Sequence, residues 1–98
     1  MKVVRIQFEG DPYYLYTLTS WFSYVEDVVR EMTCVDRIEV ETRESDAVRI
    51  YVGGDLVFEG LPDNEGVLAE ILIHALRRRG FTCGESELSG EESRSDRS

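Results

Sequence analysis

Two cysteines are the residues of this 98-residue chain best suited to covalent chemistry. Cys34 and Cys83 lie far apart, and neither belongs to a CxxC motif or to a cluster of histidine and cysteine. This spacing supports neither a structural zinc site nor a dithiol redox motif. The two thiols remain candidates for a disulfide or for redox exchange, depending on where the fold places them.

The residues available for acid–base or metal chemistry give weaker signals. His74 is the only histidine, and nothing near it in sequence supplies a nucleophile or a second ligand, so we expect it to be solvated and without a role. Glu39 and Glu41 project from one face of a predicted strand and could form an acid–base pair or hold a divalent cation. Because Arg5 and Arg49 are interleaved with them, we expect a charge-paired solvent face instead. We predict no catalytic residue, no metal site and no cofactor.

The charge balance bears on the class of partner. The chain has 11 lysines and arginines against 20 acidic residues, a formal net charge of −9. Such a protein repels phosphate backbones and anionic membranes, so we expect no nucleic-acid and no membrane partner. No apolar run approaches the roughly 20 residues that span a bilayer, and the first residues lack a signal-peptide pattern. These features predict a soluble cytoplasmic protein.

An alternating segment followed by a helical pattern opens the chain. Residues 3–9 alternate between apolar and polar side chains, which predicts a half-buried strand. Asp11 is the expected N-cap and Pro12 the first turn of a helix over residues 13–32. The residues expected to face inward are Val4, Ile6 and Phe8 on the strand, and Leu15, Leu18, Phe22, Val25, Val29 and Met32 on the helix, with Trp21 and Val28 widening its apolar stripe.

The rest of the chain predicts three more strands and a second helix. The strands cover residues 37–42, 47–52 and 55–59, and the helix covers residues 64–79. Val40 is expected to face inward on the first of these strands. Gly53-Gly54 suits a tight hairpin between the last two strands, and Asp63 is the expected cap of the second helix.

The polar side chains of the strands decide the predicted architecture. A sheet covered on both faces has nearly continuous apolar strands, whereas these strands alternate. We therefore predict an α/β (α+β) fold of order βαβββα. It is a two-layer open-faced sandwich, with a four-stranded mixed sheet and both helices on one face. A right-handed crossover makes the first two strands parallel. Residues 1–83 form one domain, and the acidic, serine- and glycine-rich residues 84–98 are predicted to be a flexible tail.

This element order, together with the segment "IYVGGDLVFEGLPDNEGVLAEIL" at residues 50–72, resembles the C-terminal half of thioredoxin-like proteins. In that superfamily a β-hairpin of this type leads into the last helix. The direct link between strands at residues 43–46 is similar to the selenoprotein W-like branch. The resemblance covers residues 3–80 and implies a thioredoxin-like fold.

The redox motif of that superfamily is missing here. Thioredoxin-like enzymes carry CxxC or a related motif at the start of the first helix, where the helix N-terminus stabilises a thiolate. In this chain the corner reads Gly10-Asp11-Pro12-Tyr13-Tyr14-Leu15, without a thiol. The proline that precedes the third strand in classical members is replaced by Asp46. The resemblance therefore implies a redox-inactive member.

The predicted topology brings the two cysteines toward each other. Cys34 follows the first helix and Cys83 follows the second, and both helices are expected to end at the same edge of the sheet. A disulfide is possible if the two Cα atoms lie within about 7 Å. In an ordinary cytosol we expect reduced thiols, and in a hyperthermophile cytosol a bridge.

Three tyrosines of the first helix do not fit its apolar stripe. Tyr13, Tyr16 and Tyr24 fall on another side of the helix. Partly exposed tyrosines are typical anchors of protein interfaces, so we expect these residues to contact a protein partner or a second copy in a homo-oligomer.

The sequence thus predicts a small non-enzymatic protein that acts through protein contacts or self-association, with an edge strand or the tyrosine side of the first helix as its surface. One alternative is a thiol-dependent redox protein that uses Cys34 or Cys83. Another is a ferredoxin-like regulatory or small-ligand-binding module, which requires that "FTCGESEL" at residues 81–88 form a further strand.

Overall fold

Four strands and two helices follow one another in the predicted order. The structure is a computed structural model, and it describes residues 1–83. The elements are β1 (Val3–Gly10), α1 (Pro12–Thr33), β2 (Arg37–Glu44), β3 (Arg49–Val52), β4 (Asp55–Glu59) and α2 (Glu65–Arg78). The tail predicted for residues 84–98 lies outside the described residues, as does most of the strand considered for residues 81–88. Phe81, Thr82 and Cys83 themselves are not in a strand.

The strands form one mixed sheet in the order β2-β1-β3-β4. β1 pairs in parallel with β2 and antiparallel with β3, and β3 pairs antiparallel with β4. The parallel first pair and the β3–β4 hairpin were both predicted. The turn of that hairpin needs glycine, because Gly53 and Gly54 have φ angles of 59° and 91°, in the left-handed region.

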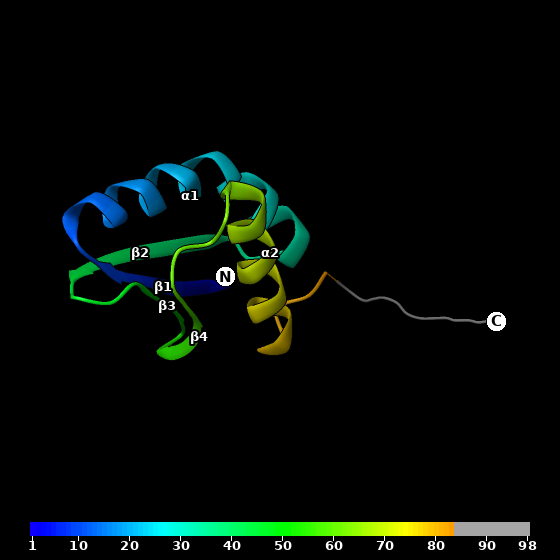
Figure 1. Cartoon of the computed structure of the whole chain (residues 1–98). Helices are drawn as coiled ribbons and strands as arrows, with labels where there is room; N and C mark the ends of the chain where they lie inside the picture. Colours follow the sequence, from blue (N-terminus) through cyan, green and yellow to red (C-terminus); the bar gives the residue numbers. More distant parts are fainter. Residues whose placement is uncertain (84–98) are drawn as a thin grey trace, which may run out of the picture.

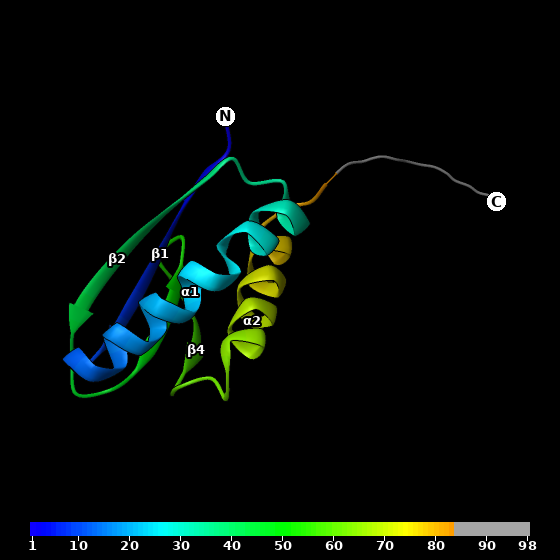
Figure 2. The same cartoon turned by 90° about the horizontal axis from the view of Figure 1, so that it is seen from above.

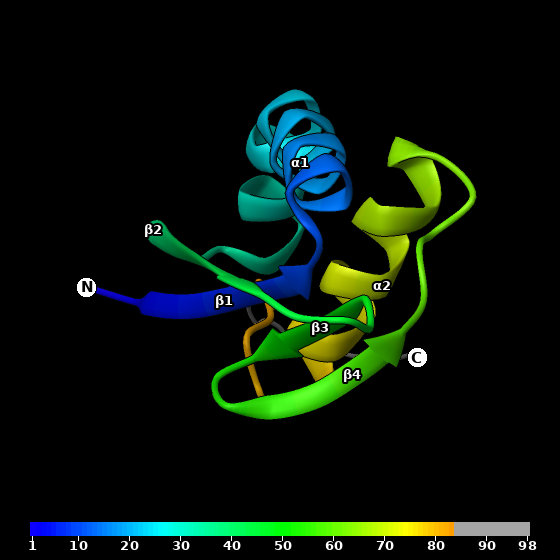
Figure 3. The same cartoon turned by 60° about the vertical axis from the view of Figure 1, so that its left-hand side comes forward.

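Both helices lie on the same side of the sheet (Figures 1 and 3). The alternation in β1 explains this arrangement, since Ile6 and Phe8 are completely buried while Arg5 points to the other face and is exposed. No segment among residues 1–83 covers that other face (Figure 3). The one-sided burial predicted from the alternating strands is therefore confirmed.

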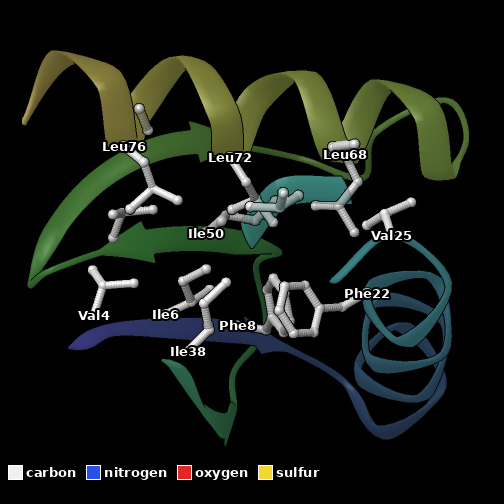
Figure 4. Packing of buried hydrophobic residues seen from close by; sticks show 14 of the residues in the cluster. Val4, Ile6, Phe8, Phe22, Val25, Ile38, Ile50, Leu68, Leu72 and Leu76 are labelled. Atoms are coloured by element: carbon white, nitrogen blue, oxygen red, sulfur yellow. The ribbon is translucent and has the colours of Figure 1, made fainter. Parts of the chain in front are cut away.

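The core lies between the sheet and the two helices. The ring of Phe8 meets that of Phe22 on α1 edge to face, with centroids 6.2 Å apart. Leu68, Leu72 and Leu76 of α2 point toward the sheet in Figure 4, and all three are fully buried. α1 and α2 run toward the same end of the molecule in Figure 2, but α2 also descends away from α1 in Figure 1, so the two helices cross at an angle.

Side-chain caps begin both helices. The side chain of Asp11 accepts a hydrogen bond from the Tyr14 amide at 2.9 Å, as predicted. At α2 the prediction of Asp63 was wrong, because Asn64 accepts the Val67 amide at 2.9 Å. Asp and Asn are equally good N-caps, so the path of the backbone after Pro62 decides which of the two side chains reaches the helix.

Three residues predicted to be buried are more exposed than expected. Val28 is 51% exposed and Met32 is 44% exposed, because both lie on a flank of α1 that α2 covers only in part. Trp21, on the same flank, is half-buried and packs against the core. Val40 pairs with Ile6 but is 37% exposed, because β2 is an edge strand. The spacing of apolar residues gives the centre of a buried stripe but not its width.

The central position of Phe8 makes its side chain a sensitive test of the fold. We expect Phe8→Ala to lower the free energy of unfolding by about 3–5 kcal/mol, because it leaves a cavity between β1 and α1. Urea unfolding followed by circular dichroism measures this change.

Leu56→Ala is the matched control, since Leu56 is 48% exposed and its truncation should cost less than about 1 kcal/mol. Equal effects of the two substitutions would contradict the location of the core.

Candidate functional site

Three exposed tyrosines form one surface on the outer side of α1. Tyr13, Tyr16 and Tyr24 are 71%, 72% and 78% exposed. They lie opposite the buried side of the helix, which carries Leu18 and Phe22. We call the surface formed by Tyr13, Tyr16 and Tyr24, with Ser20 between them, the tyrosine face. The structure leaves all three predicted tyrosines in solvent on one side of one helix.

The part of α1 that carries the tyrosine face has no charged side chain. Residues 12–25 contain no aspartate, glutamate, lysine or arginine, although 32% of the whole chain is charged. The charged residues of α1 begin at Glu26. Depletion of charge together with enrichment in tyrosine is the composition of an interface core, whereas an ordinary exposed helix face carries charges. This uncharged run is a signal that inspection of the tyrosines alone does not give.

The corner between β1 and α1 holds aromatic rings in place of a nucleophile. Pro12 occupies the first turn of the helix, and the carboxylate of Asp11 is engaged by the backbone as a cap. The rings of Tyr13 and Tyr14 meet edge to face with centroids 5.4 Å apart. The positive end of the α1 dipole therefore faces a capping carboxylate and not a thiol.

The structure brings Cys34 and Cys83 together. Their sulfur atoms lie at disulfide-bonding distance and their Cα atoms are 5.2 Å apart. Both residues are exposed and follow the C-terminal ends of α1 and α2, where Cys34 adopts a left-handed conformation with φ of 54°. Whether the bond is present in solution remains a prediction.

The surroundings of the cysteine pair do not favour a reactive thiolate. The C-terminal end of a helix carries the negative end of the helix dipole, which opposes a negative charge on Cys34. The guanidinium of Arg77 reaches the same end of α1, where its Nη2 atom donates a hydrogen bond to the carbonyl oxygen of Met32 at 3.2 Å. These surroundings suit a structural link between the two helix ends.

A buried carboxylate, that of Glu9, lies on the open face of the sheet, and the sequence pattern did not predict its burial. Glu9 is only 7% exposed, although no helix covers it. It accepts hydrogen bonds from Gln7 Nε2 at 3.1 Å and Tyr51 Oη at 3.3 Å. Arg43 and Arg49 approach its two oxygens at 3.8 and 3.7 Å. These four side chains shield Glu9, so it is a structural anchor and not a free acid.

The other carboxylates of this face are also paired. Glu39 lies 2.7 Å from Arg37 and 3.9 Å from Arg5, and Glu41 lies 3.4 Å from Arg5. The predicted pairing with Arg5 is present, whereas Arg49 pairs with Glu9 and Glu59 instead. The hydrogen bond that Arg49 Nε donates to Glu59 at 3.2 Å raises the pKa of Arg49, because it favours the charged form of the guanidinium. No pair of glutamates here is left free for acid–base chemistry.

His74 lies in the lining of a shallow groove between β4 and α2. The groove has a volume of about 430 Å³, with Leu56 and Ile71 among its apolar residues. Arg79 and Asp55 also line the groove, and their side chains form an ion pair. His74 is exposed and has no hydrogen bond to another described side chain, and we assign it no role.

Neither a metal centre nor a membrane-spanning helix is found in the part of the chain that the structure describes. Within residues 1–83, no group of three or more histidine, cysteine, aspartate or glutamate side chains could hold a metal ion. Neither helix of this part combines the length and the apolar composition that crossing a membrane requires. No family model matches the chain, and no curated protein sequence matches it.

The cysteine pair gives a testable effect on stability. Closing a loop between residues separated by 49 positions should raise the free energy of unfolding by about 4 kcal/mol in the chain-entropy model. We expect native, unreduced protein to take up no alkylating reagent by mass spectrometry, and reductant to lower its urea midpoint.

The variant Cys34→Ser/Cys83→Ser is the control, and its urea midpoint should not respond to reductant. Uptake of two alkyl groups before reduction would show free thiols and contradict the link.

Proposed function

We propose that this chain is a small non-enzymatic protein with a redox-inactive thioredoxin-like fold that acts by binding a protein surface through its tyrosine face. The observation that carries the proposal is the uncharged, exposed side of α1, with Tyr13, Tyr16 and Tyr24 at 71–78% exposure. Isolated exposed apolar residues are normal, but a contiguous uncharged surface of three tyrosines in a strongly charged chain needs an explanation.

The topology of the sheet supports the thioredoxin-like part of the proposal. The β3–β4 hairpin leads into α2, as the resemblance implies, and it belongs to a mixed sheet in which β1 and β2 are parallel. The redox-inactive part rests on the corner before α1, where Asp11 and Pro12 stand in place of thiols.

Tyrosine suits a binding role at these positions. A tyrosine buries about 150–250 Å² when it is covered, and its hydroxyl group can find a polar partner in the interface. It also loses little conformational entropy, because only two side-chain torsions are fixed. The serine and threonine residues between the tyrosines add hydrogen-bonding capacity without charge.

The test is loss of binding when two tyrosines are truncated. We expect Tyr16→Ala/Tyr24→Ala to weaken association by roughly thirtyfold, if each anchor contributes about 1 kcal/mol. Affinity capture from the lysate of the source organism, together with the solution mass of the purified protein, measures the loss. Both side chains lie outside the core, so circular dichroism and the urea midpoint should show a folded variant.

Leu56→Ala is a matched control on β4, because it removes an exposed apolar side chain outside the tyrosine face. If the double variant is folded and keeps every capture signal and the same solution mass, the tyrosine face is not the binding surface.

A second candidate function is thiol–disulfide exchange by Cys34 or Cys83. The observation in its favour is that the two exposed residues lie within disulfide distance. The position of Cys34 at a helix C-terminus argues against it, since an attacking thiolate is stabilised at a helix N-terminus.

An insulin-reduction assay separates the two functions. We expect the wild-type protein to show no more activity than Cys34→Ser, because neither thiol lies in an electropositive site of the kind that activates cysteine. Activity that Cys34→Ser abolishes would overturn the non-enzymatic proposal.

A further inference from the structure

We propose that the partner of the tyrosine face is a second copy of this chain, bound through antiparallel packing of α1 against α1 about a two-fold axis at Ser20. This inference rests on the proposed function and narrows it from any protein partner to the chain itself. It is carried by the spacing of the exposed residues on α1, by their exposure and by the distribution of charge along the helix.

The exposed residues of α1 are arranged symmetrically about Ser20. Tyr16 precedes Ser20 by four positions and Tyr24 follows it by four, while Tyr13 precedes it by seven and Asp27 follows it by seven. Steps of three and four residues keep side chains on one side of a helix. When two copies pack antiparallel, Tyr16 of each copy therefore meets Tyr24 of the other.

The same antiparallel arrangement also gives a partner to Tyr13, which lies farther from Ser20. Tyr13 comes opposite Asp27 of the second copy, where a phenol can donate a hydrogen bond to a carboxylate. The Asp27 side chain is 93% exposed and makes only a 3.8 Å ion pair with Arg30. Ser20 lies at the crossing point, where a small side chain lets two helices approach closely.

Charge favours the antiparallel direction over the parallel one. The first turn of α1 has no acidic residue, whereas Glu26, Asp27 and Glu31 lie in its second half. In a parallel dimer these acidic residues would lie beside the same acidic residues of the second copy, and the like charges would repel each other. Antiparallel helices place them toward the positive end of the partner's helix dipole. The nearby carboxylate of Asp11 is engaged by the Tyr14 amide.

The available area fits a reversible dimer. Three tyrosines that are 71–78% exposed offer on the order of 450 Å² per copy, given about 200 Å² for each side chain. A standard interface buries about 800 Å² per partner. Thr17 and Ser20 are half-exposed and add a little to the contact, so the area is that of a weak, transient complex. We expect a dissociation constant in the micromolar range.

Sedimentation equilibrium and photo-oxidative dityrosine crosslinking test the proposal. Full-length protein should show a concentration-dependent dimer, and Tyr16→Ala/Tyr24→Ala should raise its dissociation constant at least tenfold. For crosslinking, all proteins carry Tyr13→Phe to remove the neighbouring phenol. Adding Tyr16→Phe or Tyr24→Phe should abolish the covalent dimer in each case, because the crosslink needs one residue of each kind. Mixing these two variants should restore it, since one end of the mixed dimer regains the pair.

Two outcomes would overturn the antiparallel dimer. Undiminished crosslinking of the Tyr24→Phe variant alone would indicate that Tyr16 meets Tyr16, as in parallel helices. A strictly monomeric protein at all concentrations would exclude the second copy. If Tyr16→Ala/Tyr24→Ala also loses a captured protein, the proposed function stands with a different partner; if it loses nothing, the proposed function fails as well.

Discussion

The one-sided burial of β1 is the constraint on which the other elements depend. β1 lies between β2 and β3, and its residues Ile6 and Phe8 have no exposed surface. Burying one such side chain contributes about 1.5–3 kcal/mol, whereas an exposed ion pair contributes about 0–1 kcal/mol. The apolar face therefore decides where α1 and α2 lie. The opposite face can stay open because its side chains pair with one another.

The charged side chains on that open face fix the register in which the strands pair, and they add little to the free energy of unfolding. Arg43, Glu9, Arg49 and Glu59 lie side by side on the four strands, so that the sign of the charge alternates across the sheet. A shift of β2 by two residues would keep its apolar side chains on the core side. It would also bring Glu41 beside Glu9 in place of Arg43, and like charges directly opposite are destabilising.

Features governed by neighbours in sequence could be predicted, and features governed by distant contacts could not. The alternation of β1, the Asp11 cap and the Gly53-Gly54 turn follow from local chemistry, and all three are present. The exposure of Val28 depends instead on how far α2 reaches along α1. The burial of Glu9 depends on the register of three strands, which sets Arg43 and Arg49 on either side of it. The tyrosines fall between these cases, since helical spacing puts them outside the core but does not say what covers them.

Folding alone gives little reason for the residues on the outer side of α1. Tyrosine, threonine and serine form helices less readily than alanine, lysine, arginine or glutamate, by up to about 0.7 kcal/mol per residue. Residues 13–24 nevertheless place such side chains at most of their exposed positions. A helix selected only to cover the sheet would carry charged side chains there, which also increase solubility. The proposed contact with another surface would account for both the missing charge and the weaker helix formers, and the symmetric spacing about Ser20 is the reason for proposing a second copy as the partner.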